Sequence, residues 1–129
     1  MPSHIALVTL VVQDYDAAIA FYVGKLGFDL AEDTLLGPGK RWVVVRPPGG
    51  QGTGLLLSQA SGDIQAAAIG AQTGGRVGFF LHTDDFARDH AAFTAKGVTF
   101  LEPPRREDYG TVAVFEDLHG NRWDLLQLA

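Results

Sequence analysis

The first sixty residues begin with a nearly continuous apolar run, which is followed by apolar positions at helical spacing. Residues 5–12 are almost continuously apolar and rich in β-branched types, which predicts a buried strand rather than a helix. From Asp14 the apolar positions recur at helical spacing as far as Val23, so we expect a helix that Asp14 or Asp16 caps. Turn formers then separate three short predicted strands, at residues 28–31, 42–46 and 55–58. The first half therefore predicts the order βαβββ.

The second half of the chain repeats this plan. A strand at 77–83 precedes Asp84 and Asp85, and a helix carrying Phe86, His90 and Phe93 comes next. Three further strands are predicted, at residues 98–101, 111–115 and 122–127. Val8–Val12 overlay Phe79–Thr83 with an offset of 79 − 8 = 71 residues. We interpret the match as an internal duplication, with chance similarity between two strand–helix units as the alternative.

The segment between the two halves is rich in Ala, Gly and Ser. It covers about residues 60–76, and a short helix is expected near 63–71. Because this linker is short and fairly apolar, we expect one domain over residues 1–129, made of modules at about 1–59 and 77–129. The expected fold class is α+β.

Composition narrows the function classes. Hydrophobic residues make up 47% and charged residues 19%, as in ordinary globular domains, so disorder and fibrous repeats are poor interpretations. The formal net charge of −5 and the scattered basic residues argue against a nucleic-acid surface. Absence of cysteine excludes disulfides and thiolate chemistry. No signal peptide, membrane span or membrane partner is predicted, and the expected location is the cytoplasm.

Several spaced motifs resemble one known family. They are Asp14, Phe21-Tyr22 and Leu26-Gly27-Phe28 in the first module, and FEDLHGNRWDLL at residues 115–126 in the second. With the βαβββ repeat, these motifs resemble the vicinal oxygen chelate superfamily, which contains glyoxalases, extradiol dioxygenases and bleomycin-resistance proteins. The resemblance implies two modules that form one cup-shaped mixed sheet around a ligand cavity, with helices outside, commonly in a homodimer. It does not imply a particular reaction.

The resemblance also implies four metal-ligand positions, two in each module. In this sequence the first-strand positions are Leu7 and Gly78, and the position late in the first module falls within residues 54–56, which are Gly, Leu and Leu. Only Asp124 matches a ligand type. Because catalytic metal sites normally keep about three protein ligands, we predict no metal and no other cofactor.

Two histidines could change that prediction. A register slip would bring His4 to the first-strand position, although alternation places it on the other face of the strand. His82 shares the strand parity of Gly78 and could line the same cavity as Asp124. Asp124 and His82 are therefore the candidate catalytic residues, acting as an acid–base pair, while their alternative roles are a carboxylate held by a nearby Arg and an exposed histidine at a strand end.

An aromatic and partly polar lining is expected for the cavity. Its candidate ligand-binding residues, which could equally be core residues, are Trp42, Arg46, Tyr22, Tyr109 and Phe115. No nucleophile elbow and no P-loop is present in the sequence.

Three functions remain open from the sequence. The first is a domain that binds a small organic molecule in its cup without a full metal site. The second is a lyase or dioxygenase-type enzyme that uses a non-standard metal set or metal-free acid–base chemistry. The third is an interaction domain with no ligand. We predict the first, in a homodimer, and leave open whether any reaction is catalysed.

Overall fold

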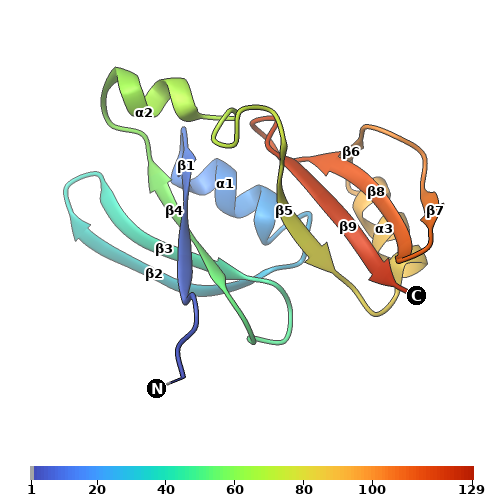
Figure 1. Ribbon diagram of the computed structural model, residues 1–129. Helices are drawn as coiled ribbons and strands as arrows, with labels where there is room; N and C mark the ends of the chain where they lie inside the picture. Colours follow the sequence, from blue (N-terminus) through green and yellow to red (C-terminus); the bar gives the residue numbers. More distant parts are fainter. Residues whose placement is uncertain (1) are drawn as a thin grey trace. The chain divides into compact units, whose positions relative to one another are not determined.

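The computed structural model describes residues 2–129 and shows two compact units. The boundary along the chain lies between Ile69 and Gly70. This boundary falls within the predicted linker at residues 60–76. Each unit contains one sheet and one helix that packs on it (Figure 1).

The first unit contains four strands and two helices. They are β1 (Leu7–Val12), α1 (Tyr15–Tyr22), β2 (Asp29–Gly37), β3 (Lys40–Arg46), β4 (Gly54–Gln59) and α2 (Gly62–Ala68). The strand order is β1-β4-β3-β2, with β1 parallel to β4 and the other neighbours antiparallel. The first strand of the unit therefore pairs with its last strand, and α1 crosses between them against β3 and β4.

The second unit has the same plan. Its elements are β5 (Val77–His82), α3 (Phe86–Ala95), β6 (Thr99–Phe100), β7 (Arg105–Glu107), β8 (Gly110–Glu116) and β9 (Arg122–Leu128). The strand order is β5-β9-β8-β6, with β7 also paired to β8, and the first strand is again parallel to the last. The repeated βαβββ order and the α+β class are thus confirmed.

Both sheet helices begin where the sequence predicts. The Asp14 carboxylate accepts a hydrogen bond from the Ala17 amide at 2.8 Å, and the Asp85 carboxylate accepts one from the Arg88 amide at 3.0 Å. Each bond satisfies a donor that the first helical turn leaves without a partner, so both aspartates are N-caps.

Two strands differ from the prediction because they are exposed and lack a regular alternation of apolar and polar residues. β2 runs to Gly37 instead of stopping at residue 31, although every residue before Gly37 is exposed. β7 was not predicted at all. Pairing with a neighbouring strand, rather than an apolar pattern, defines both elements.

Strand pairing differs from the single sheet that the resemblance implies. Within residues 2–129, hydrogen-bonded strand pairs occur inside each unit, which makes two sheets, one of four strands and one of five.

The two apolar cores lie between each sheet and its helix. In the first unit, Leu10, Val43, Val45 and Leu57 are fully buried on the face toward α1. By strand alternation, the residues between them point to the opposite face. In the second unit, the same alternation gives the sheet one face toward α3 and one face turned away from α3.

Candidate functional site

A groove lies in the first unit where β3 and β4 diverge. These strands pair only at Val43–Val45 with Leu55–Leu57, although β3 begins at Lys40 and β4 continues to Gln59. Where the two strands no longer pair with each other, a groove of about 480 Å³ lies between them. The groove is therefore a consequence of strand register, which the pattern of a single strand does not reveal.

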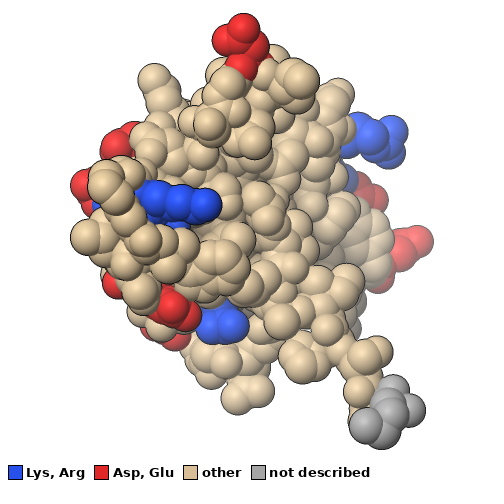
Figure 2. Space-filling view, turned by 90° about the vertical axis from the view of Figure 1, so that its left-hand side faces the viewer, with Lys and Arg blue, Asp and Glu red and all other residues tan. Residues whose placement is uncertain are grey.

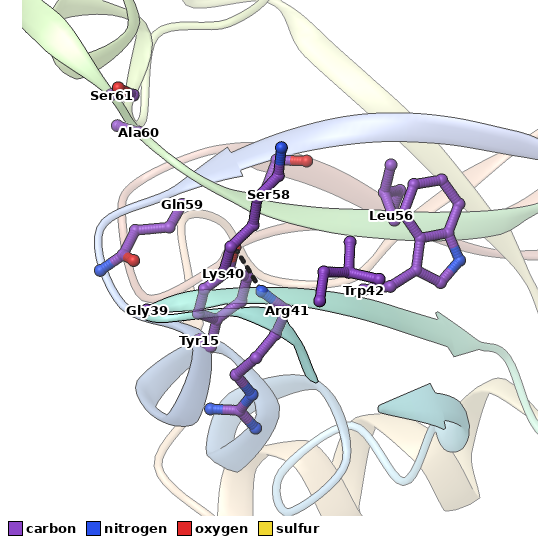
Figure 3. Close-up of a pocket in the computed structure, with 11 residues that line it drawn as sticks. Tyr15, Gly39, Lys40, Arg41, Trp42, Leu56, Ser58, Gln59, Ala60 and Ser61 are labelled. Carbon is purple, nitrogen blue, oxygen red and sulfur yellow. Dashed lines mark hydrogen bonds between the residues drawn. The ribbon is translucent and has the colours of Figure 1, made fainter. Parts of the chain in front are cut away.

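Trp42 is the largest apolar side chain in this groove. It is 37% exposed, and its indole lies beside Leu56 of the neighbouring strand (Figure 3). Ser58, Gln59 and Ser61 add polar groups at the other side of the groove. An exposed indole beside an aliphatic floor is suited to stacking with a planar apolar ring.

Arg41 and Tyr15 close one end of the groove. The Tyr15 hydroxyl accepts a hydrogen bond from the Arg41 backbone amide at 3.3 Å, drawn as the dashed line in Figure 3. The Arg41 guanidinium lies 5.2 Å from the centre of the Tyr15 ring and forms ion pairs with Asp16 at 2.8 Å and Asp33 at 2.7 Å. Its charge is thus already neutralised by two carboxylates.

Arg46 lies on the same face of β3 as Trp42, at the other end of the strand. A Cβ atom added to Gly54 would lie 3.1 Å from Arg46 Cγ, 3.2 Å from Arg46 Nε and 3.2 Å from a Leu7 methyl. The arginine stem therefore lies over the strand at Gly54. Leu7 is one position where the resemblance implies a metal ligand, and Gly54, which pairs with it directly, belongs to the segment 54–56 in which another is implied. The Arg46 side chain and the Leu7 methyl group occupy the space beside Gly54.

In the second unit, Asp124 and His82 lie on one face, as predicted from parity. Phe80 is the direct neighbour of Asp124, and His82 is opposite Leu126, one pleat further along β5. Phe80 is 62% exposed and His82 is exposed. The face opposite α3 thus carries a half-buried carboxylate next to an exposed aromatic ring.

Burial raises the pKa of the Asp124 carboxyl above its usual value. The positive charge of Arg105 opposes this rise, while the negative charge of Glu102 adds to it. Arg105 is engaged by Glu102 and Glu107, each at 2.8 Å. Asp124 therefore lies in a partly apolar setting where a proton or a cation would stabilise it.

The DLHGN segment before β9 has a structural role. One carboxylate oxygen of Asp117 accepts hydrogen bonds from the backbone amides of His119 and Asn121, both at 2.9 Å. Its other oxygen accepts one from the Asn121 side chain at 2.9 Å. Asp117 and Asn121 are both buried, so this turn holds the start of the strand that carries Asp124.

The remaining predicted residues are not among those that line the groove. Tyr22 and Phe115 are fully buried in the cores of their units, where Tyr22 packs on Phe21 and Phe115 stacks on Trp123. Tyr109 is 50% exposed between β7 and β8. His4 is exposed before β1. The ligand role of these side chains remains a prediction.

The side of the molecule that carries the β2–β3 hairpin is shown in Figure 2, where much of the surface is uncharged and acidic groups lie mainly toward the margins. Within residues 2–129, no cluster of three or more His, Asp or Glu side chains is arranged to hold a metal ion. Among the same residues, no helix is long and apolar enough to cross a membrane.

Comparison with known proteins identifies the family. The model of the Glyoxalase/Bleomycin resistance protein/Dioxygenase superfamily matches residues 3–125, and the chain belongs to this family. An uncharacterized protein of Shewanella frigidimarina (strain NCIMB 400) is 58% identical, over 99% of this chain and 96% of the relative.

Solved structures agree with this assignment. The crystal structure of UcmS2 is 30% identical with a TM-score of 0.84, covering 98% of both chains. That of TnmS3, described as an antibiotic binding protein from Streptomyces sp. CB03234, is 32% identical with a TM-score of 0.79, covering 99% of this chain and 98% of the other.

Sequence reasoning missed part of the site. Phe80, Leu56 and Tyr15 were not singled out, because each reads as an ordinary apolar residue within its element. Their positions depend on which strands pair and in which register. Strand parity from Asp124 could have indicated Phe80 only if the β5–β9 pairing had been known.

Proposed function

We propose that this protein binds a planar aromatic organic molecule in the groove between β3 and β4, with Trp42 as the stacking surface. The observation that carries the proposal is the contrast between the two tryptophans, since Trp42 is 37% exposed in a groove while Trp123 is 4% exposed in the core. The likeness to TnmS3, described as an antibiotic binding protein, supports binding of a small organic molecule.

A fluorescence titration with two aromatic antibiotics, bleomycin and doxorubicin, tests this function. Binding of either one should quench the emission of Trp42 and leave that of buried Trp123 nearly unchanged. Trp42→Leu keeps an apolar side chain but removes the ring, so calorimetry should show an affinity roughly tenfold lower, the scale of a lost stacking contact.

Leu118→Ala provides a matched control, since Leu118 is an exposed apolar residue of the second unit. This variant should bind as the parent does. Equal affinity of the parent and Trp42→Leu for both antibiotics would show that the groove is not the binding site.

Acid–base catalysis is a second candidate function. It is favoured by the shared face of Asp124 and His82 and by the raised pKa of Asp124, which suits a group that holds or releases a proton. An assay with the hemithioacetal of methylglyoxal and glutathione should then show turnover that Asp124→Asn abolishes. Turnover unchanged by this substitution would remove Asp124 from the reaction.

We also propose that the chain forms a homodimer in the cytoplasm. The edge strand β2 supports the dimer, because it leaves backbone groups open to pairing and exposes Leu30, Leu35 and Leu36. The location is checked by fractionation of cells that express a tagged chain, which should recover it with cytoplasmic markers.

A further inference from the structure

Arg46 differs from the paired arginines of this protein in its surroundings. Arg41, Arg88 and Arg105 each contact two carboxylates. Arg46 is half-buried, yet within residues 2–129 its guanidinium forms no ion pair and no side-chain hydrogen bond. Partial burial of a cation beside apolar groups is unfavourable unless an anion or other acceptor accompanies it.

The sheet holds Arg46 in this position. Its stem lies over Gly54 of β4, where the missing side chain provides the space, and Leu7 of the next strand borders the same space. Asp29 is the cross-strand neighbour of Arg46 on β2, but it is exposed and no ion pair forms between them. The stem of Arg46 is thus directed over β4, whereas Asp29 lies on β2, on the other side of β3.

Arg46 and Trp42 belong to one surface. They are separated by four residues of β3 and so point to the same face, about 13 Å apart along the strand at 3.3 Å per residue. Between them lie Val44 and its cross-strand partner Leu56. Val44 is only 3% exposed, so the residues of this face that a ligand could contact are Trp42 and Leu56, which line the groove, and Arg46, which lies beyond its lining.

We propose that Arg46 is an anion-binding subsite beside the groove, so that the ligand is an elongated aromatic carboxylate that extends beyond the groove, its ring stacked on Trp42 and its carboxylate paired with the Arg46 guanidinium. The proposal rests on the proposed function, which supplies the aromatic part of the ligand. It adds the charge of the ligand and its orientation. A planar guanidinium can hold both oxygens of a carboxylate at once, which an amide of the same shape cannot match.

Two probes that differ only in charge test the subsite. They are biphenyl-4-carboxylate and the neutral biphenyl-4-carboxamide, each titrated into the full chain by calorimetry. The parent protein should bind the carboxylate about tenfold more tightly, the scale of a charge-assisted hydrogen bond. Arg46→Gln should remove this preference and leave binding of the amide nearly unchanged.

Arg122→Gln is the matched control, because Arg122 is an exposed arginine of the second unit and its removal changes the net charge equally. It should keep the preference for the carboxylate. Gly54→Ala retains the guanidinium but places a methyl against the Arg46 stem, so it should reduce the preference by displacing the charge. Thermal unfolding of each variant shows whether its fold is intact.

A readout at Arg46 itself separates this inference from the proposed function. The Nε–Hε resonance of Arg46, assigned by its loss in Arg46→Gln, should shift when benzoate is added. If Trp42→Leu binds the biphenyl probes as the parent does while this resonance shifts, the stacking site is wrong and the anion subsite stands. If the resonance does not move, or Arg46→Gln keeps the preference for the carboxylate, the subsite is overturned whatever Trp42 contributes.

Discussion

At the scale of single residues, two aspartates lie in opposite electrostatic settings. Burial raises the pKa of Asp124, whereas the hydrogen bond from Arg41 lowers the pKa of Asp33. A raised pKa means that the folded state binds a proton more readily than the unfolded chain, so the ionised carboxylate of Asp124 destabilises the fold above its own pKa. A lowered pKa has the reverse sign, and the ionised Asp33 stabilises the fold.

Asp124→Asn should therefore leave the protein at least as stable as the parent at pH 7. The advantage should shrink as the pH falls through the raised pKa and vanish below the ordinary aspartate value of 3.8, where both states of the parent are protonated. Thermal unfolding across this pH range measures the difference.

Asp33→Asn is the comparison with opposite sign. It should lower the unfolding temperature at pH 7, and its deficit should disappear as the pH falls through the lowered pKa of Asp33.

For Asp124→Asn, a large loss of stability at pH 7 would contradict the prediction and would mean that the Asp124 carboxylate holds the sheet together.

At the scale of elements, the N-caps of α3 and α2 allow the contribution of a capping side chain to stability to be tested. The Asp85 side chain caps α3 through the Arg88 amide, whereas Ser61 occupies the N-cap position of α2 without a side-chain capping bond. Asp85→Ala should therefore cost about 1 kcal/mol of unfolding free energy, and Ser61→Ala only a few tenths. Urea unfolding of both variants measures this, and equal losses would show that the Asp85 bond does not stabilise the helix.

Strands were predicted from the sequence less completely than the two helices that pack on the sheets. β3, with three fully or nearly buried valines, was predicted at residues 42–46, but the exposed edge strand β2 was predicted to less than half its length. A helix satisfies its own hydrogen bonds, so its caps and period are local. A strand needs a partner, and an exposed edge strand without an apolar pattern shows no sign of that partner in its own residues.

At the scale of the whole molecule, the expected homodimer is testable through β2. Sedimentation at micromolar concentration should give a species of twice the 13.8 kDa chain mass. Leu35→Lys should shift the protein toward a single chain, because Leu35 is a 72% exposed apolar residue on this edge strand. Ile64→Lys, on the surface of α2 and 89% exposed, should leave the mass unchanged.

A single-chain species of the parent at this concentration would refute the dimer. A dimer that Leu35→Lys leaves intact, or that Ile64→Lys disrupts equally, would place its interface elsewhere than β2.

The sequence by itself determined the α+β class, the repeated βαβββ order and the family, and it limited the cap of the first helix to Asp14 or Asp16. These follow from periodicity, caps and spaced motifs, which are encoded within a few residues of each other. Alternation also indicated which residues share a face within each of the strands that carry His82 and Asp124, whereas the β5–β9 pairing decided that these two faces are the same.

Only the tertiary structure decided where a ligand could bind. Trp42 and Tyr22 are similar as sequence signals, yet one lies in a groove and the other is fully buried in the core. The groove exists because β3 and β4 pair over three residues and then separate, and the Arg46 stem can lie over β4 because Gly54 has no side chain. Register and close packing join residues that are distant in the chain, so no local pattern carries them.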